Sequence, residues 1–399
     1  MRRFPDARWL FGLCLVEALT MLAFLNYSAL LPLFEAEWRL SHTEAGLIFS
    51  AYQLGYIGAV AVLSSLTDWV EPRRIYLLSA LWAGLVNLAF AALAGGFASA
   101  LVLRAFAGAG LGGTYMPGMR LVAERFPSAR RGLALGCYIA TFTLGSSASL
   151  LLTGAANARW GWRAAFVLTA IGPLLAAGFA WLLLTPSPGG RVVRERRSSS
   201  DAVWRNRSVL RLIVAYAAHN WELFGMRGWI AAFLTASLVA AGASLEGATE
   251  RAAVVASLVL AVGALSNPIA GFVSDRWGRA RLISTVMSVS GVCSLVIGWG
   301  LQWPFALLVT VALVYSFIVT AESAVVSTGI TEQAEPAALG RTMALQSTIG
   351  FTTAALAPAG FGLVLDLSQT WGWAFTLLGA GVLVGPLTLG FREVGVKAP

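Results

Sequence analysis

The chain has 399 residues, of which 58% are apolar and only 12% are charged, and its formal net charge is +9. A soluble globular domain carries roughly a quarter charged residues and under half apolar ones. This composition excludes an ordinary soluble domain and indicates a protein whose apolar surface faces a lipid bilayer.

Twelve apolar runs follow one another along the chain, and each is long enough to cross a hydrocarbon core of about 30 Å as a helix. They cover residues 9–34, 44–66, 75–95, 98–120, 132–155, 163–184, 209–239, 251–273, 281–300, 304–328, 340–364 and 371–391. The sequence therefore predicts an all-α integral membrane protein with twelve transmembrane helices.

The basic residues between these runs predict the orientation in the membrane. With a cytoplasmic N-terminus, most arginines fall in inner loops, and only Arg39, Arg159, Arg163 and Arg251 fall in outer loops. The positive-inside rule then places both termini in the cytoplasm of a multi-pass protein of the cell membrane, here the bacterial inner membrane. The same distribution argues against a nucleic-acid partner, because the charges do not gather in one soluble patch.

The longest polar segment, residues 185–208, is rich in Pro, Gly, Ser and Arg and is predicted to be a cytoplasmic linker. It divides the chain into an N-terminal six-helix bundle, residues 1–184, and a C-terminal six-helix bundle, residues 209–399. The two bundles are predicted to be pseudo-symmetric repeats in the same orientation.

Three landmarks recur at nearly one offset and support this repeat. Asp275 follows Asp68 by 207 residues, and Arg341 follows Arg131 by 210. The sequence Trp-Gly-Trp at 371–373 repeats the one at 160–162 after 211 residues.

The most specific local motif is GFVSDRWGRAR, which begins at Gly271, between the eighth and ninth runs. Asp275 can cap a helix N-terminus and pair with Arg276 or Arg279. Glycines such as Gly278 permit a tight turn and close packing. Such a charged cluster can hold helices in one state and release them in another, so these residues are candidate gating residues.

The corresponding loop of the first half is degenerate. It keeps Asp68, Arg73 and Arg74, but it lacks the glycines and the first arginine of the motif. Asp68 and Arg73 are therefore weaker gating candidates.

A second motif, Arg104-x-x-x-Gly108-x-Gly110, places an arginine inside the fourth run. A charge at this depth is costly and must face protein or water. Arg104 is either a functional group or an arginine that only binds backbone carbonyls of the first run.

These two motifs and the twelve-run architecture resemble the Major Facilitator Superfamily. The resemblance implies a secondary carrier that works by alternating access between two six-helix halves. In relatives with the intramembrane motif the arginine is linked to proton coupling, which makes Arg104 a candidate coupling residue. The motifs do not indicate a substrate.

The seventh run carries the most informative polar face. His219, Asn220, Glu222 and Arg227 share an arc of roughly 160° on a helix, and such a face is expected to line a cavity. His219 and Glu222 are neighbours three residues apart and can together take up and release a proton. Arg227 can hold an anionic substrate or neutralise a glutamate. The alternative is a structural polar cluster that fixes helix packing.

Other candidate substrate or coupling residues are Glu17 in the first run and Glu322 in the tenth. Tyr27 shares a face with Glu17, and Tyr52 and Tyr56 lie one turn apart in the second run. The tyrosines either line the cavity or serve packing.

A phosphate-binding GxxxxGK[ST] loop is excluded because Lys397 is the only lysine. The chain is therefore not itself an ATP-driven pump, and transport energy must come from a gradient or from a partner. No catalytic residues, metal site or cofactor are predicted. With two histidines, His42 and His219, a membrane-embedded enzyme is disfavoured, and the internal repeat favours a carrier over a channel.

The first functional hypothesis is a proton-linked secondary transporter of a small polar or anionic solute, for which a monomer suffices. The alternative is a proton-driven efflux antiporter of amphipathic drugs. The Arg104 motif and the aromatic content fit this alternative, but the fifth run reads Gly145-Ser-Ser-Ala-Ser and lacks the proline of the antiporter motif. The sequence leaves solute, direction, coupling ion and oligomeric state open.

Overall fold

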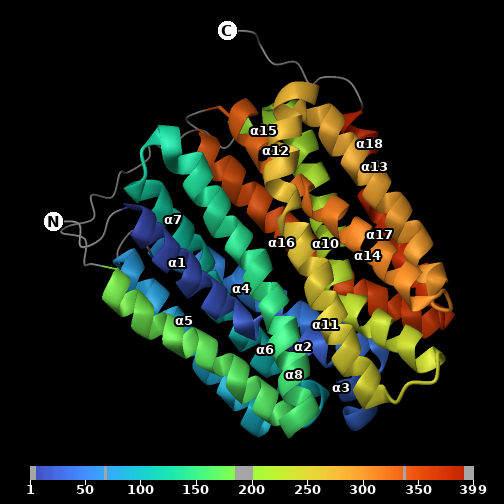
Figure 1. Ribbon diagram of the computed structural model, residues 1–399. Coiled ribbons are helices and arrows are strands. Elements are labelled where there is room, and N and C mark those ends of the chain that lie inside the picture. Colours follow the sequence, from blue (N-terminus) through green and yellow to red (C-terminus); the bar gives the residue numbers. More distant parts are fainter. Residues whose placement is uncertain (1–5, 67–69, 185–200, 336–337, 391–399) are drawn as a thin grey trace. The chain divides into compact units, whose positions relative to one another are not determined.

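The computed structural model describes residues 6–66, 70–184, 201–335 and 338–390. Helices account for nearly all of this described part, and no strand occurs in it (Figure 1). The all-α prediction is confirmed.

The first predicted span is a broken helix. It comprises α1 (Asp6–Thr20), η1 (Met21–Ala23), α2 (Asn26–Ala29) and α3 (Leu31–Trp38). Near the break, the backbone N–H of Leu25 donates a hydrogen bond to the hydroxyl of Ser149 at 3.2 Å. This bond replaces the one that the N–H would make to a carbonyl of the preceding turn in a regular helix. Pro32, in the first turn of α3, has no N–H to donate to the preceding turn. The break exposes backbone carbonyls inside the protein.

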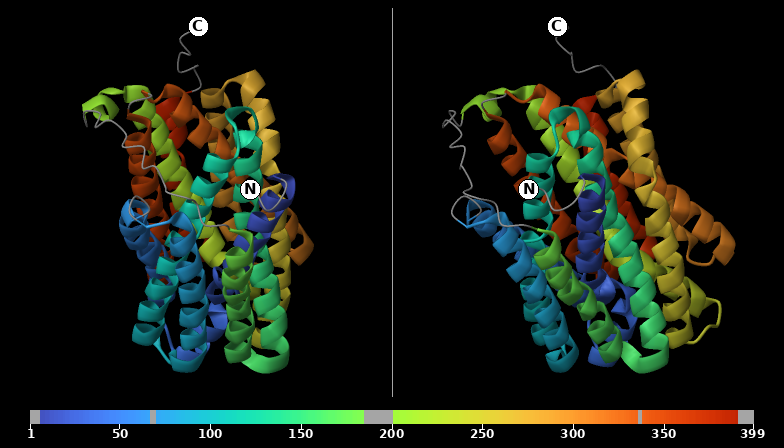
Figure 2. Two further views of the ribbon diagram at one scale, coloured as in Figure 1. Left: turned by 90° about the vertical axis from the view of Figure 1, so that its left-hand side faces the viewer. Right: turned by 60° about the vertical axis from the view of Figure 1, so that its left-hand side comes forward.

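The next helices are α4 (His42–Leu66), α5 (Pro72–Leu93), α6 (Phe97–Gly112), α7 (Tyr115–Arg125) and α8 (Ser128–Leu183). The fifth and sixth predicted spans both lie in α8, and Gly161 separates them with φ 79° and ψ 168°. This positive φ favours glycine. Figure 2 shows the chain turning back there, so that the two parts of α8 run alongside each other.

Helices α4 and α6 pack closely through glycines. A Cβ atom at Gly108 would collide with the backbone carbonyl of Tyr52, and one at Gly55 would collide with that of Ala105. Gly55 and Gly108 thus let the backbones of α4 and α6 come into direct contact.

The remaining helices carry the second predicted half. They are α9 (Asp201–Arg205), α10 (Arg207–Ala240), α11 (Leu245–Ala264), α12 (Ser266–Trp277), α13 (Arg279–Ile297), η2 (Gly298–Gly300), α14 (Phe305–Thr320), α15 (Glu322–Gln333), α16 (Leu339–Ser368), α17 (Trp371–Val382) and α18 (Val384–Leu389). Single residues interrupt three of the predicted spans, at Leu265, Ala321 and Leu383.

Nine helical segments in the described part are long and apolar enough to cross a membrane. One of them, Leu133–Leu183, covers two of the predicted spans. The structure therefore supports a multi-pass membrane protein, while the count of twelve spans and the cytoplasmic termini stay predictions.

The described residues form two compact units. The first lies within Met1–Val192 and Ile230–Ala261, and the second within Val193–Trp229 and Val262–Pro399. Within the first unit, α11 packs on α8, where the hydroxyl of Ser147 donates to the carbonyl of Ser257 at 2.7 Å. The division into six-helix bundles at residues 184 and 209 stays a prediction.

Each unit has an apolar core that positions its polar residues. In the first unit, α1, α5, α7 and α8 contribute a cluster around Leu13, Tyr76 and Tyr138. In the second, α10, α12, α13, α15, α17 and α18 contribute a cluster around Ile213, Met287 and Val326.

Candidate functional site

The polar face of α10 is buried in the second unit. His219 and Glu222 are 0% exposed, Asn220 is 3% exposed and Arg227 is 4% exposed. Burial of several ionisable groups on one helix is costly unless other polar groups compensate for it. Helices α13, α14 and α15 supply these groups.

The carboxylate of Glu222 accepts hydrogen bonds from two helices. Ser290 of α13 donates from Oγ to Oε2 at 2.8 Å, and Tyr315 of α14 donates from Oη to Oε1 at 3.1 Å. The same Ser290 hydroxyl lies 3.4 Å from Oε1 of Glu322, at the start of α15. Because a hydroxyl has one hydrogen, Ser290 can donate to only one of the two carboxyl groups at a time.

His219 completes this cluster. Its Nε2 lies 2.6 Å from the hydroxyl of Ser323, and its Nδ1 lies 3.1 Å from Oε2 of Glu322. This second contact is within ion-pair distance, but its direction is not that of a hydrogen bond, and neither atom has a hydrogen-bond partner among the described residues. His219 and Glu222 of the seventh predicted run therefore meet Glu322 of the tenth in one place.

Asn220 and Arg227 lie on the same helix but contact other groups. Asn220 donates to the carbonyl of Tyr216 at 2.8 Å. The guanidinium carbon of Arg227 lies 5.8 Å from the centre of the Phe224 ring. Arg227 is five residues beyond Glu222, which corresponds to about 7.5 Å along the helix axis.

Arg104 of α6 binds the broken first span in the other unit. It donates to the carbonyl of Phe24 at 2.7 Å, to that of Ala23 at 3.3 Å and to Oδ1 of Asn26 at 3.0 Å. Its guanidinium also lies 4.3 Å from the centre of the Tyr52 ring. Carbonyls at the end of a helical segment carry partial negative charge, and they stabilise this fully buried cation.

A chain of amides holds Asn26 in place. Its Nδ2 donates to Oδ1 of Asn87 at 2.9 Å and to Oγ1 of Thr169 at 3.2 Å. Asn87 in turn donates to the carbonyl of Phe166 at 2.9 Å. The network connects α2, α5, α6 and α8.

Glu17 of α1 is fully buried in the same unit. Its Oε2 accepts from Tyr138 at 2.7 Å and from Tyr76 at 3.1 Å, and the hydroxyl of Thr20 lies 3.4 Å away. The structure thus surrounds a candidate coupling residue with phenolic donors from α5 and α8.

The three candidate tyrosines are also buried. Tyr27 donates to the carbonyl of Ala45 at 3.2 Å, and Tyr52 packs between Arg104 and Phe24. Tyr56 is 2% exposed on α4.

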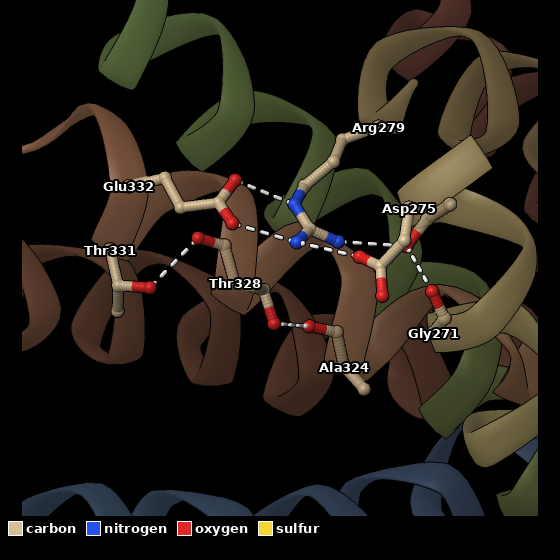
Figure 3. Close-up of polar contacts among 8 residues, drawn as sticks. Gly271, Asp275, Arg279, Ala324, Thr328, Thr331 and Glu332 are labelled. Carbon is tan, nitrogen blue, oxygen red and sulfur yellow. Dashed lines mark hydrogen bonds and ion pairs between the residues drawn. The ribbon is translucent and has the colours of Figure 1, made fainter. Parts of the chain in front are cut away.

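Two of the candidate gating residues, Asp275 and Arg279, belong to a charged network at the start of α13 (Figure 3). Arg279 donates to both carboxylate oxygens of Glu332 of α15, at 2.6 and 2.7 Å. It also donates to Oδ1 of Asp275 at 3.0 Å and to the hydroxyl of Ser274 at 2.7 Å. Figure 3 shows Glu332 and Asp275 on opposite sides of the guanidinium.

The other residues of this motif have distinct roles in the structure. Gly278 connects α12 to α13 with φ 84°, a conformation that favours glycine. Arg276 lies 3.7 Å from the centre of the Phe272 ring, one turn earlier. A Cβ at Gly271 would meet nothing within 4 Å among the described residues, so the structure gives no packing reason for this glycine.

In the first unit, Arg73 donates to the carbonyl of Trp181 at 3.0 Å and thereby joins α5 to α8. Asp68 lies outside the described residues.

Sequence reasoning missed the partners of these charged groups. Ser290, Tyr315 and Ser323 were not predicted, because serine and tyrosine are common in transmembrane helices and carry no motif. Glu332 had one usable signal, an acidic residue close to the end of an apolar run. In the described part of the chain, no group of three or more His, Cys, Asp and Glu residues could hold a metal ion.

Comparison with known proteins identifies the family. The family model described as Major Facilitator Superfamily matches residues 13–249, more than half of the chain. The chain is 25% identical over 375 residues to a hexuronate transporter of Bacillus subtilis, covering 87% of this chain and 85% of the relative. It is 26% identical to the cis,cis-muconate transport protein of Acinetobacter baylyi, covering 91% and 88%.

A probable sulfoacetate transporter of Cupriavidus necator is 25% identical and covers 66% of this chain and 64% of its own. Among solved structures, a bacterial homologue of the human lysosomal transporter Spinster, in an inward-facing and occupied conformation, has a TM-score of 0.77. It is 17% identical and covers 96% of this chain and 95% of its own. At this identity the likeness establishes the fold.

The chain belongs to the Major Facilitator Superfamily. It is therefore a multi-pass transporter of the cell membrane rather than an enzyme.

Proposed function

We propose that the chain is a proton-coupled secondary transporter of small organic anions, with carboxylates as the solute class, and that it works by alternating access. The names of its relatives support this solute class. Hexuronate, cis,cis-muconate and sulfoacetate are all organic anions that carry a carboxylate.

Arg227 is the proposed recognition residue for the anion. It is buried on the polar face of α10, and a guanidinium can bind a carboxylate through two parallel hydrogen bonds. Arg104 is less suited to this role because its guanidinium already binds two backbone carbonyls and Asn26.

The observation that carries proton coupling is the position of Ser290 between Glu222 and Glu322. One hydroxyl lies within 3.4 Å of both carboxyl groups, and both are buried. Two adjacent carboxylates without water repel each other, and a proton on one of them removes this repulsion. His219, 3.1 Å from Glu322, can hold a further proton. Binding and release of a proton here would change the charge near Arg227.

Thermal shift measurements on the purified protein test the solute class first. Glucuronate, cis,cis-muconate and sulfoacetate should raise the melting temperature, because a ligand that binds only the folded state stabilises it. Arg227→Ala should remove the effect, with Arg205→Ala, in the short helix α9, as the matched control. Stabilisation by lipophilic cations alone would contradict the proposal and favour the drug-efflux alternative.

Transport in proteoliposomes tests the coupling. An inward proton gradient should drive accumulation of a stabilising anion, and a protonophore should abolish that accumulation. Accumulation that does not depend on the proton gradient would overturn the coupling.

A further inference from the structure

Glu17 is a second buried carboxyl group, and the proposed proton cluster on α10 does not include it. Its side chain is fully buried, and Oε1 has no hydrogen-bond partner among the described residues. Oε2, in contrast, is close to three hydroxyl groups. The two oxygens of one carboxyl group therefore have very different surroundings.

The hydrogens available to Glu17 can be counted. The hydroxyl of Thr20 lies 2.7 Å from the backbone carbonyl of Glu17 and 3.4 Å from its Oε2, so its single hydrogen goes to the backbone. Tyr138 lies 2.7 Å from Oε2 and 3.4 Å from the carbonyl of Thr114, so it donates to the carboxyl group. Tyr76 donates from α5 at 3.1 Å. The phenolic hydroxyls of Tyr76 and Tyr138 are thus the two hydrogen-bond donors to Oε2.

The groups that face Glu17 include no cation that pairs with it in the described part of the chain. They are Tyr76 from α5, Tyr138 from α8, Tyr52 from α4 and Cys14 from α1 itself. Two phenolic donors stabilise the carboxylate, whereas burial without a cation stabilises the carboxylic acid. Neither protonation state is excluded by the surroundings.

We propose that Glu17 is a second proton-binding site of the transporter, separate from the site on α10. A carboxylate oxygen, Oε1, takes a proton from hydronium to give a carboxylic acid and water, and the reverse step returns the proton to water. Glu17 and Glu222 are 205 residues apart, close to the offsets of the internal repeat. Each lies in the first helix of its predicted half and accepts a hydrogen bond from a tyrosine. Each half would then carry one buried glutamate that exchanges a proton.

Infrared difference spectroscopy tests this site without any solute. The protein in lipid nanodiscs is compared between acidic and alkaline buffer, and the carbonyl-stretch band of protonated carboxyl groups is recorded. Glu17→Gln should remove one component of this band, while Glu222→Gln and Glu322→Gln should leave that component in place. A Glu17→Gln spectrum identical to that of the wild type would overturn the proposal.

Tyr138→Phe provides a second variant that keeps the carboxyl group. Loss of the 2.7 Å donor destabilises the carboxylate, so the Glu17 component should persist into more alkaline buffer. Tyr115→Phe, which removes the hydroxyl of the ring stacked on Tyr138, is the matched control and should leave the component unchanged. An unchanged titration in Tyr138→Phe would contradict the site even if Glu17→Gln failed to fold.

The role of Glu17 in transport rests on the proposed function, whereas its proton binding does not. If no organic anion is transported, the proposed function fails and the infrared result still decides the site. If transport is proton-coupled, Glu17→Gln should lower the number of protons per solute by one. An unchanged proton-to-solute ratio would show that Glu17 takes no part in the cycle.

Discussion

Arg279 and Glu332, 53 residues apart in the sequence, form two hydrogen bonds of 2.6 and 2.7 Å. This bidentate pair joins the start of α13 to the end of α15. Asp275 contributes one further bond to the same guanidinium and is 66% exposed in its side chain. The glutamate, outside the sequence motif, is therefore the stronger partner of the arginine.

Glu332→Gln should consequently slow transport more than Asp275→Asn, with the solute affinity little changed in both. The paired side chains are 21% and 50% exposed, so the loss of stability should be only about 1 kcal/mol. Initial rates and KM in proteoliposomes measure the effect. Equal turnover of Glu332→Gln and the wild type would show that the pair does not control the rate.

Glu222→Gln should abolish uphill accumulation and retain solute exchange. The amide oxygen can still accept from one of the two hydroxyl groups of Ser290 and Tyr315, and the amide NH2 can donate to the oxygen of the other, so the fold is preserved, but the amide cannot exchange a proton. Counterflow and gradient-driven uptake are compared on the same proteoliposomes. Intact uphill transport would remove Glu222 from the coupling mechanism.

Ser290→Ala should alter the pH dependence of transport without abolishing it. Its hydroxyl is the group within reach of both Glu222 and Glu322, and its removal leaves the carboxyl groups with one donor fewer. The free energy of unfolding should fall by about 1–2 kcal/mol. Ser288→Ala is a control on the same helix, because Ser288 donates only to a backbone carbonyl. Identical pH profiles in Ser290→Ala and the wild type would contradict the shared-proton interpretation.

Asn26→Leu should destabilise the first unit by about 3 kcal/mol, because it removes an acceptor from buried Arg104 and two donors from the amide chain. Thr169→Val, which keeps the shape of the side chain but removes the hydroxyl that accepts from Asn26 and Asn87, should cost about 1 kcal/mol. Denaturation midpoints measure both. Similar effects of the two substitutions would argue against a special role for the Arg104 contact.

Gly108→Ala should destabilise the protein by about 1–3 kcal/mol, because its Cβ would overlap the backbone carbonyl of Tyr52. Gly58→Ala, in α4, is the matched control. No atom lies within 4 Å of a Cβ at that position, so alanine should be neutral or stabilising. Equal melting temperatures for the two variants would show that α6 can move away from α4.

The helices were predictable because a membrane requires long apolar runs. The charged residues of the site stood out because charged residues are rare within such runs. The interruptions were harder to predict. Nothing in the local pattern around Ala321 or Leu265 marks a break, since both lie within long apolar runs of the sequence. The meeting of Glu222 with Glu322 depends on packing between α10, α13 and α15, and one sequence contains no measure of that packing.

Gly161 reverses the chain with a single residue outside the helical conformation. There is no loop between the two helical parts of α8. An epitope or a fluorescent label inserted at Gly161 would therefore have to displace a helical turn. Residues 241–244 connect two separate helices, and a Cβ at Gly242 would meet no neighbouring atom. This second connection is the better position for a reporter of conformational change.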